Sequence, residues 1–304
     1  MPRTRKITTP LLAVAAVAAI ALAGCAAQPA GADGADTGDA EARETVTIAI
    51  VEGGVPIWDR VEELAAEEGI DLEYTTFTDW VLPNTSVQND EIDLNVFQHA
   101  AFLSQFNVAN DGDIVPLGSV RLSLDGLFSS RYDSLDALPD GASVSIPQDA
   151  ANLGRALRLI ESEGLIELGD DAGLFPTPDD IARNPKNLQF TLVAGEQLPF
   201  TYPDVDLVAG GTFGLSNADV PVDEALATTD PDAAFNLPYV LVVAAREGRA
   251  DDPTLQRVAE LFQDASLAAY IEEKSQGTNI QAIVPLEELR EVLAELEDAA
   301  RAEG

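Results

Sequence analysis

The sequence predicts an α/β fold with two lobes, and three observations lead to this prediction. β-rich runs alternate with helical patterns between residues 45 and 108, which is typical of right-handed strand–helix–strand units. A second set of strand and helix patterns follows over residues 142–209, after the regular strand–helix alternation of the first region has ended. A strongly apolar strand at 238–245 then leads into three helical segments. The predicted lobes comprise residues 45–130 with 236–304, and residues 131–235.

The first lobe is expected to begin with a β-strand at Thr45–Val51, a run rich in β-branched residues. A helical pattern follows, with apolar residues at Val61 and Leu64, and Gly69 ends it. The remaining elements expected in this region are strands at 70–77 and 92–96 and helices at 84–89 and 99–108. This order favours a parallel sheet, whose ligands bind beyond the carboxyl ends of its strands.

Residues 113–130 are expected to form a pair of strands that leads out of the first lobe. The second lobe contains expected strands at 142–147, 188–194 and 205–209 and a helix at 152–163. The chain then returns, with a strand at 238–245 and helices at 254–264, 266–276 and 285–303. The two passages between lobes are expected near Ser129-Ser130-Arg131 and Asn236-Leu237-Pro238.

The first 25 residues have the organisation of a secretory leader. Basic residues near the start precede an apolar run from Leu11 to Ala23, and the run ends in Leu22-Ala23-Gly24-Cys25. This ending resembles a bacterial lipobox, in which the cysteine is lipidated and becomes the first mature residue. We expect a signal peptide at 1–24, a lipid on Cys25 and a flexible tether over 25–44. The alternatives are a transmembrane helix or an ordinary cleaved signal, but the run is short for a span of about 20 residues.

The chain is strongly acidic, with 53 Asp and Glu against 17 Lys and Arg and a net charge of −36. This charge argues against nucleic acid as a partner, because phosphate contacts need Lys and Arg. It also argues against binding flat on an anionic membrane. A simpler interpretation is that the charge serves solubility. A single cysteine excludes a disulfide within the chain.

The sequence offers no recognised catalytic motif. It has no Gly-x-Ser-x-Gly elbow, no Gly-x-x-x-x-Gly-Lys-Ser/Thr loop and no His-Glu-x-x-His site. Its only histidine, His99, cannot by itself build a typical metal site. We therefore expect a protein that is not an enzyme and that needs no cofactor or metal.

Several motifs, spread over most of the chain from residue 45, are shared with one protein family. They are Phe77-Thr78-Asp79-Trp80, Asp93-Leu94-Asn95-Val96-Phe97-Gln98-His99, Ile146-Pro147-Gln148-Asp149, Asn152-x-x-Arg155-Ala156-Leu157 and Asp204-Val205-Asp206. The chain thereby resembles the NLPA / MetQ-type lipoproteins, the substrate-binding components of methionine-uptake ABC transporters. The Phe-Gln-His and Asn-x-x-Arg-Ala-Leu motifs, in this order, carry most of the specificity.

The resemblance implies a type II periplasmic-binding-protein fold with a ligand cleft between its lobes. It also implies capture of an amino acid, methionine or a relative, and delivery to a permease that a cytoplasmic ATPase powers. The protein would be anchored to the cell membrane by its lipid and face outside the cytoplasm. Two alternatives stay open: a surface lipoprotein with an adhesive or scaffolding role, and a binder of a different small solute.

Arg155 is the candidate clamp for a ligand carboxylate, because a guanidinium matches a carboxylate bidentately. Asn152 lies three residues earlier, so the two share a face at the start of the expected helix. In the family these two positions contact the backbone of the ligand. The alternative is a surface arginine that pairs with acidic neighbours.

The resemblance assigns Phe97 and His99 to the pocket for the ligand side chain. Trp80 and Phe102 would add aromatic walls, which suit an apolar or thioether side chain. The alternative is that His99 is a structural hydrogen-bonding group and that Phe97 and Phe102 are ordinary core residues.

The chain departs from the family pattern in three respects. Tyrosines that the family has near Trp80 and near Phe102 are missing, and Ile57 stands where a His or Tyr is common. Thr212 lies in or near the position of a family Asn. We expect its hydroxyl to accept a hydrogen bond from the ligand ammonium, although it lacks the donor of an amide.

Overall fold

The computed structural model describes residues 43–51, 56–275 and 277–303, which form one compact unit. The expected signal peptide, Cys25 and the tether up to residue 42 lie outside these residues, so these expectations stay predictions. Glu44 is already the first residue of a strand, one residue before the expected start. Among the described residues, the helices are all too short or too polar to cross a membrane.

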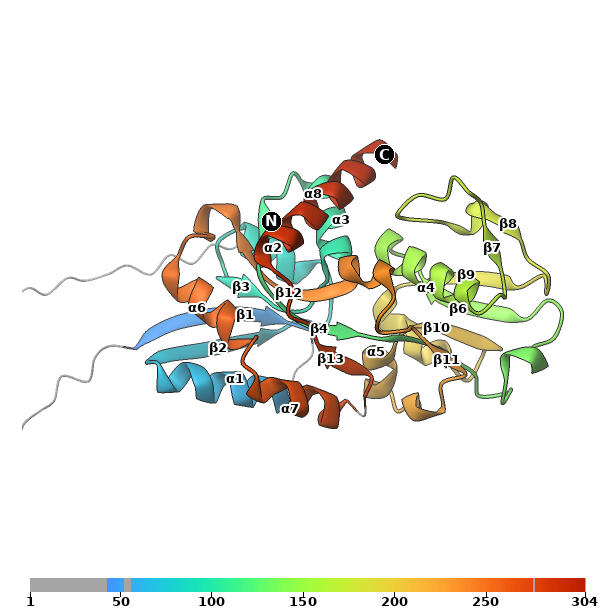
Figure 1. The fold of residues 1–304 in the computed structure, drawn as a ribbon, viewed down its shortest axis with the longest axis horizontal. Coiled ribbons are helices and arrows are strands. Elements are labelled where there is room, and N and C mark those ends of the chain that lie inside the picture. The colour runs from blue at the N-terminus through green and yellow to red at the C-terminus, as the bar shows by residue number, and fades with distance from the viewer. Residues whose placement is uncertain (1–42, 52–55, 276, 304) are drawn as a thin grey trace, which may run out of the picture. The chain divides into compact units, whose positions relative to one another are not determined.

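A six-stranded sheet forms the first half of the fold, in the order β13-β4-β12-β3-β1-β2 (Figure 1). Its strands are β1 (Glu44–Ile50), β2 (Ile70–Thr76), β3 (Leu94–Asn95), β4 (Ile114–Ser123), β12 (Val240–Arg246) and β13 (Asn279–Gln281). β1 pairs in parallel with β2 and β3, as expected. β12 runs antiparallel to β3 and β4, and β13 runs antiparallel to β4, so the sheet is mixed rather than wholly parallel.

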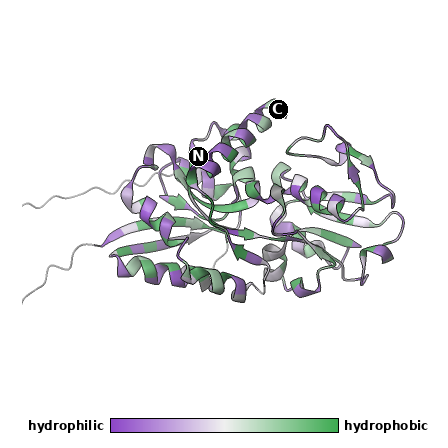
Figure 2. Ribbon diagram, in the orientation of Figure 1, coloured by the Kyte–Doolittle hydropathy of each residue, from purple (hydrophilic) through white to green (hydrophobic). Residues whose placement is uncertain are grey.

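Helices cover both faces of this sheet (Figure 1), and hydrophobic residues, green in Figure 2, run along its strands. The strand β12 shows why both faces are covered. Its side chains alternate between two cores because successive strand residues point to opposite faces. Leu241 and Val243 join the core under α1, α6 and α7, whereas Val242 and Ala244 join the core under α2, α3 and α8. These helices are α1 (Pro56–Glu67), α2 (Leu82–Gln88), α3 (Ala100–Asn110), α6 (Pro253–Leu261), α7 (Ser266–Lys274) and α8 (Leu286–Glu303).

A five-stranded sheet forms the second half, in the order β11-β5-β10-β6-β9. Its strands are β5 (Asp125–Phe128), β6 (Ser143–Pro147), β9 (Gln189–Val193), β10 (Leu207–Gly211) and β11 (Ala227–Thr228). β6 is parallel to β9 and β10, and α4 (Ala150–Ser162) packs on one face. Val208 of β10 packs on the opposite face, with Leu215 of α5 (Thr212–Asn217). A separate two-stranded sheet joins β7 (Glu167–Leu168) and β8 (Ile181–Arg183).

The expected strand pair over residues 113–130 is wrong in its pairing. β4 and β5 belong to different sheets, and Leu124 alone separates them. The chain therefore changes sheets at Leu124, earlier than the expected passage near Ser129-Ser130-Arg131. It returns between β11 and β12, where the second passage was expected. The precise lobe boundaries at 130 and 235 stay predictions.

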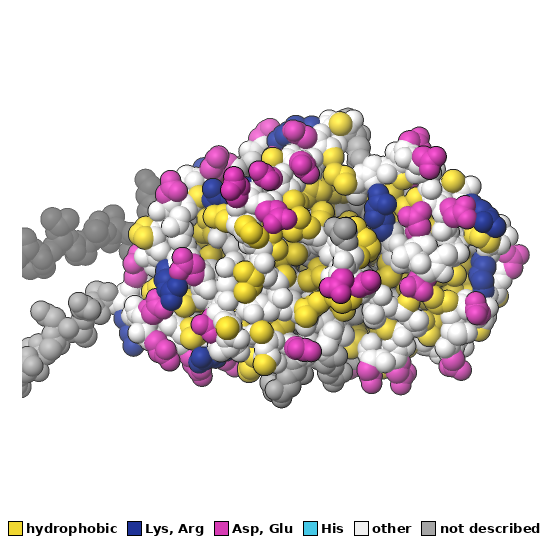
Figure 3. Space-filling model, in the orientation of Figure 1, with side chains coloured by type: hydrophobic (Ala, Val, Ile, Leu, Met, Phe, Trp, Pro, Cys, Tyr) yellow, Lys and Arg dark blue, Asp and Glu magenta, His cyan; other side chains and the backbone are white. Residues whose placement is uncertain are grey.

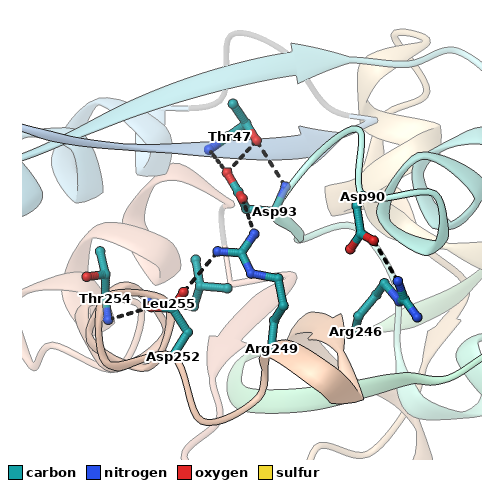
Figure 4. A network of polar contacts seen from close by, with 8 residues as sticks. All are labelled: Thr47, Asp90, Asp93, Arg246, Arg249, Asp252, Thr254 and Leu255. Atoms are coloured by element: carbon teal, nitrogen blue, oxygen red, sulfur yellow. Dashed lines mark hydrogen bonds and ion pairs between the residues drawn. The ribbon is translucent and has the colours of Figure 1, made fainter.

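Acidic side chains are spread over the visible face (Figure 3). Many arginines form ion pairs with acidic side chains. One connected group joins Thr47 of β1 to Asp93, directly before β3, and to Arg249, shortly after β12 (Figure 4). Asp93 accepts hydrogen bonds from the backbone N and the hydroxyl of Thr47, at 2.8 and 2.6 Å, and from Arg249. Arg249 also bonds Asp252, the cap of α6, at 2.9 Å. Burial acts to raise the pKa of Asp93, but the bonds from Thr47 and Arg249 outweigh it and lower the pKa.

Replacing Asp93 tests whether this network fastens β1 to the segment before α6. We expect Asp93→Ala to lower the free energy of unfolding by about 2 kcal/mol, because it strands a backbone donor and breaks charge-assisted bonds. Asp298→Ala is the matched control, because this carboxylate also pairs with an arginine but is 84% exposed. The control should change stability by less than about 0.5 kcal/mol. Equal effects in urea unfolding would contradict a structural role for the network.

Candidate functional site

A cavity of about 140 Å³ lies where strands of both sheets end. It is bounded by the carboxyl ends of β1, β6 and β10, by the segment that joins β3 to α3, and by the residues on either side of Leu124. Beyond strand ends is the usual place for a ligand in an α/β fold. The lining residues are Val51, Trp80, Phe97, Gln98, His99, Phe102, Arg121, Ser123, Asp125, Pro147, Asn152, Arg155, Gly195, Leu198, Pro199, Gly211, Gly214, Leu215 and Leu241.

Six of the seven residues expected to bind the ligand line this cavity: Trp80, Phe97, His99, Phe102, Asn152 and Arg155. They come from both halves of the fold. The first four stand on or before α2 and α3, and the other two stand on α4. The structure thus brings together side chains that are more than 50 positions apart in the sequence. Whether they hold a ligand stays a prediction.

The N-termini of α3 and α4 meet at the cavity. His99 caps α3, because its Nδ1 accepts a hydrogen bond from the backbone N of Phe102 at 3.1 Å. Asp149 caps α4 and accepts from the backbone N and the side-chain amide of Asn152, both at 3.0 Å. Nε2 of His99 then lies 3.0 Å from Oδ1 of Asn152. One chain of hydrogen bonds therefore links the two helix ends, each of which carries partial positive charge.

These contacts define the tautomer and the protonation state of His99. Nδ1 is an acceptor, so the proton of a neutral ring stands on Nε2 and is donated to Asn152. Burial and, to a lesser extent, the charge of Arg155 lower the pKa of His99 to about 3, because the bond to Asn152 opposes this shift only in part. His99 is therefore neutral near pH 7. It works as a helix cap and a bridge between the halves as well as a wall of the cavity.

Arg155 is 3% exposed and is not the surface arginine of the alternative interpretation. Its Nη1 lies 3.0 Å from Oδ1 of Asp125, and its Nη2 donates to the backbone oxygen of Ser123. The guanidinium carbon also lies 4.8 Å from the centre of the Tyr239 ring. Nε of Arg155 has no hydrogen-bond partner among the described residues. A buried donor without a partner costs about 1–3 kcal/mol, which a ligand acceptor would recover.

Aromatic rings form the apolar side of the cavity, with Phe102 at their centre. Its ring centroid lies 6.2 Å from Trp80, 6.0 Å from Phe97 and 6.4 Å from His99, in edge-to-face arrangements. The expected aromatic walls therefore adjoin one another. Trp80 also reaches across to the second half of the fold, where it leaves no room for a side chain at Gly195: a Cβ there would stand 2.3 Å from the indole ring.

Gln98 is a lining residue that the sequence motifs contained but did not assign. Its side chain is 2% exposed and forms two bonds with Asn84, at 2.7 and 2.6 Å, and one with Asn95 at 2.9 Å. This amide cluster holds the segment between β3 and α3, which carries Phe97 and His99. Such pairing satisfies the buried amides and fixes the direction of their neighbours.

The sequence reasoning missed two charged lining residues, Arg121 and Asp125. Asp125 is the acidic one. It is 2% exposed and begins β5 directly after the point where the chain changes sheets. The signal that could have found it is an acidic residue inside the apolar run Leu122-Ser123-Leu124-Asp125-Gly126-Leu127-Phe128. Burial raises the pKa of Asp125, and Arg155 only partly offsets this effect.

The expectation for Thr212 is not met by the geometry. Thr212 is fully buried and is not among the lining residues, although its neighbours Gly211 and Gly214 are. Its hydroxyl and its backbone N both donate to the backbone oxygen of Leu124, at 2.8 and 3.0 Å. Ile57 is likewise 3% exposed and lies in the core of the first sheet.

The arrangement suits a small ligand that carries an anionic group and an apolar chain. Arg155 and the two helix N-termini favour the anion, and the aromatic rings offer apolar surface. The volume lies below the roughly 300–1,000 Å³ of pockets for drug-sized molecules. The described residues contain no group of three or more His, Cys, Asp or Glu placed to hold a metal ion.

The neutral state of His99 predicts a specific loss of stability in acid. The unfolded ring binds a proton below about pH 6.5 whereas the folded ring does so only near pH 3. Stability is therefore lost as pH falls below 6.5, by up to about 1.4 kcal/mol per pH unit. His99→Gln removes this titration and retains a polar group. Between pH 6.5 and 5, wild type should lose about 1.6 kcal/mol more than the variant in urea unfolding. Parallel curves would show that His99 is not buried in its neutral form.

Comparisons with known proteins agree with this geometry. The NlpA lipoprotein family model matches residues 46–283. The chain is 32% identical over 223 residues to the D-methionine-binding lipoprotein MetQ of Salmonella typhimurium. The matched region covers 72% of this chain and 81% of that protein.

Solved structures give the same result for the fold. A periplasmic substrate-binding protein of an ABC transporter from Coxiella burnetii superposes with a TM-score of 0.73 and 30% identity, over 78% of this chain and 100% of that one. A nutrient-binding protein from Burkholderia cenocepacia bound to methionine gives 0.74 and 29%, over 78% and 100%. The expected two-lobed periplasmic-binding-protein-like fold is confirmed, and the chain belongs to the NlpA lipoprotein family.

Proposed function

We propose that this protein is the solute-binding lipoprotein of an ABC importer and that it captures methionine or a close relative. The observation that carries the proposal is the buried guanidinium of Arg155 in a cavity where the ends of two sheets meet. A carboxylate there would occupy the unused Nε donor and lie near two helix N-termini. The relatives named for methionine binding support this choice of ligand.

The apolar lining supports the side-chain part of the proposal. A thioether makes favourable contacts with ring edges, and Phe102, Trp80 and Phe97 offer such rings beside one another. The opposite wall adds Leu198 and Leu215. A linear, polarizable side chain of methionine's length suits a small cavity with these walls better than a charged one would.

Delivery of the ligand requires partners and a location that the relatives suggest. We propose a permease with a cytoplasmic ATPase as the partner, in line with the ABC transporter relative. The protein would act outside the cytoplasm, held to the membrane by a lipid on Cys25. It would act as a binding protein without turnover, because the lining residues offer no nucleophile paired with a base: His99 is occupied by Phe102 and Asn152.

Ligand binding and the role of Arg155 can be tested together. Residues 26–304, stripped of bound ligand by partial unfolding and refolding, should gain thermal stability with L- or D-methionine, by about 2.7 kcal/mol at 100 times the dissociation constant. Arg155→Met should weaken methionine binding roughly 30-fold or more in calorimetric titration, because the ligand carboxylate loses a desolvated partner.

The control is Arg158→Met, on the same helix, since the Arg158 guanidinium bonds the backbone oxygen of Gly173 at an exposed position. It should bind methionine like wild type. Methionine binding that survives Arg155→Met would remove the proposed site. A stabilising solute other than an amino acid would favour the alternative binder, and no stabilising solute would favour the scaffolding lipoprotein.

The lipid anchor gives a separate test. In a bacterial host, the full chain should partition into the detergent phase and carry a lipid-modified N-terminal Cys25, detected by mass spectrometry of the N-terminal peptide. Cys25→Ser, once its signal is cleaved, should appear in the aqueous phase with an unchanged melting temperature. A cleaved Cys25→Ser protein that stayed in the detergent phase would contradict the anchor.

A further inference from the structure

The cavity holds one acidic side chain as well as its arginines. Among the described residues that line it, Asp125 alone carries a carboxylate. This side chain is 98% buried, and its Oδ1 has no hydrogen-bond partner among the described residues, although Nη1 of Arg155 lies 3.0 Å away. The ion pair is thus close in distance but poor in hydrogen-bond angle. A buried carboxylate oxygen in this state is poised for a further donor.

The amide groups of two lining residues and the hydroxyl of Thr212 beside the cavity are already engaged. Oδ1 of Asn152 is bonded to His99, and Oε1 of Gln98 accepts from Asn84. The Thr212 hydroxyl, expected to receive the ligand ammonium, instead donates to Leu124 and is fully buried. Its neighbours at the cavity wall are glycines, which offer no side chain. Of the remaining side-chain acceptors among the described lining residues, the Ser123 hydroxyl is neutral and Asp125 alone is a carboxylate, so Asp125 is the stronger partner for a ligand ammonium.

We propose that Asp125 binds the ammonium group of the ligand and that Asp125 and Arg155 together select α-amino acids. The inference rests on the proposed function and adds a specificity-determining residue to it. In this arrangement the ligand carboxylate meets Arg155, and the ammonium on the adjacent carbon meets Oδ1 of Asp125. The two ends of an α-amino acid are separated by a single carbon, which matches two protein charges that lie 3.0 Å apart.

The charge balance of the cavity favours this arrangement. Burial raises the pKa of Asp125 even though Arg155 lies beside it, so one cation does not fully compensate the carboxylate. Asp149 adds to the upward shift. The described lining side chains carry one carboxylate, Asp125, and two guanidiniums, Arg121 and Arg155. A zwitterion can pair its carboxylate with Arg155 and its ammonium with Asp125, whereas a ligand that is only an anion brings no cationic partner for Asp125. The ion pair also disfavours uncharged solutes, because such a solute would displace water from the two charges without forming charge-assisted hydrogen bonds in its place.

The competing interpretation is that Asp125 only neutralises and positions Arg155. The two roles differ in what they predict for a ligand without an ammonium group. A positioning role affects all ligands that use Arg155, whereas direct contact affects only ligands that carry the ammonium. The useful probe is the methionine analogue in which hydrogen replaces the α-ammonium group, compared with methionine itself.

The experiment measures both dissociation constants by calorimetric titration for wild type and for Asp125→Asn. Wild type should bind methionine more tightly than the analogue. Asp125→Asn should weaken methionine binding roughly 30-fold or more and bind the analogue no more weakly than wild type does, since it removes a repulsion. Asp125→Ser, which leaves room for water beside Arg155, provides the same comparison if Asp125→Asn does not fold.

Thr212→Val is the control, because it removes the hydroxyl that the sequence suggested and should leave the preference between the two ligands unchanged. Equal losses for both ligands in Asp125→Asn, an unchanged preference, or a preference lost only in Thr212→Val would overturn the role of Asp125. Equal affinity of wild type for both ligands would overturn it without any variant. If wild type binds neither, the proposed function fails first, and the role of Asp125 fails with it.

Discussion

The buried guanidinium of Arg155 is the constraint on which the organisation of the site depends. A permanent charge that is 3% exposed must be compensated, and its partners come from separate parts of the chain. Ser123 closes β4, Asp125 opens β5, and Tyr239 precedes β12. Arg155 itself stands on α4. Compensating one charge therefore fixes the end of one sheet against the first helix of the other half.

The two sheets impose a second constraint on the site, because the strands of each sheet must be covered on both faces. Alternation along β12 and β10 sends apolar side chains to two cores in each half. With both faces covered, ligand-binding groups are left to the strand ends and to the helices that begin there. Two of these helices present their N-termini to the same cavity, and His99 and Asn152 join them. Because the two helices begin at the same cavity, the residues at and near their N-termini form its aromatic and charged walls.

Local signals in the sequence predicted most elements within a few residues, since periodicity and glycine stops are local properties. Gly69 and Gly164 end their helices with positive φ, as expected of such stops. Pairing between distant segments has no local signal, so the separation of β4 from β5 was missed. The same limit explains the site. Arg155 and His99 were found through motifs, whereas only the fold places Asp125 at the cavity. The Thr212 hydroxyl is bonded to the backbone oxygen of Leu124, a contact that the spacing of residues in the sequence does not indicate.

That bond has a mechanical consequence. Leu124 is the single residue between β4 and β5, and its carbonyl oxygen accepts two hydrogen bonds from Thr212. The backbone N of Leu124 also donates to the backbone oxygen of Thr278, directly before β13 of the first sheet, at 2.9 Å. The link is thereby held from both sheets. Any rotation of one sheet relative to the other would act on these bonds at the link and on the return segment between β11 and β12. Because Ser123 also binds Arg155, the pivot of such a rotation and the charged end of the cavity share the same few atoms.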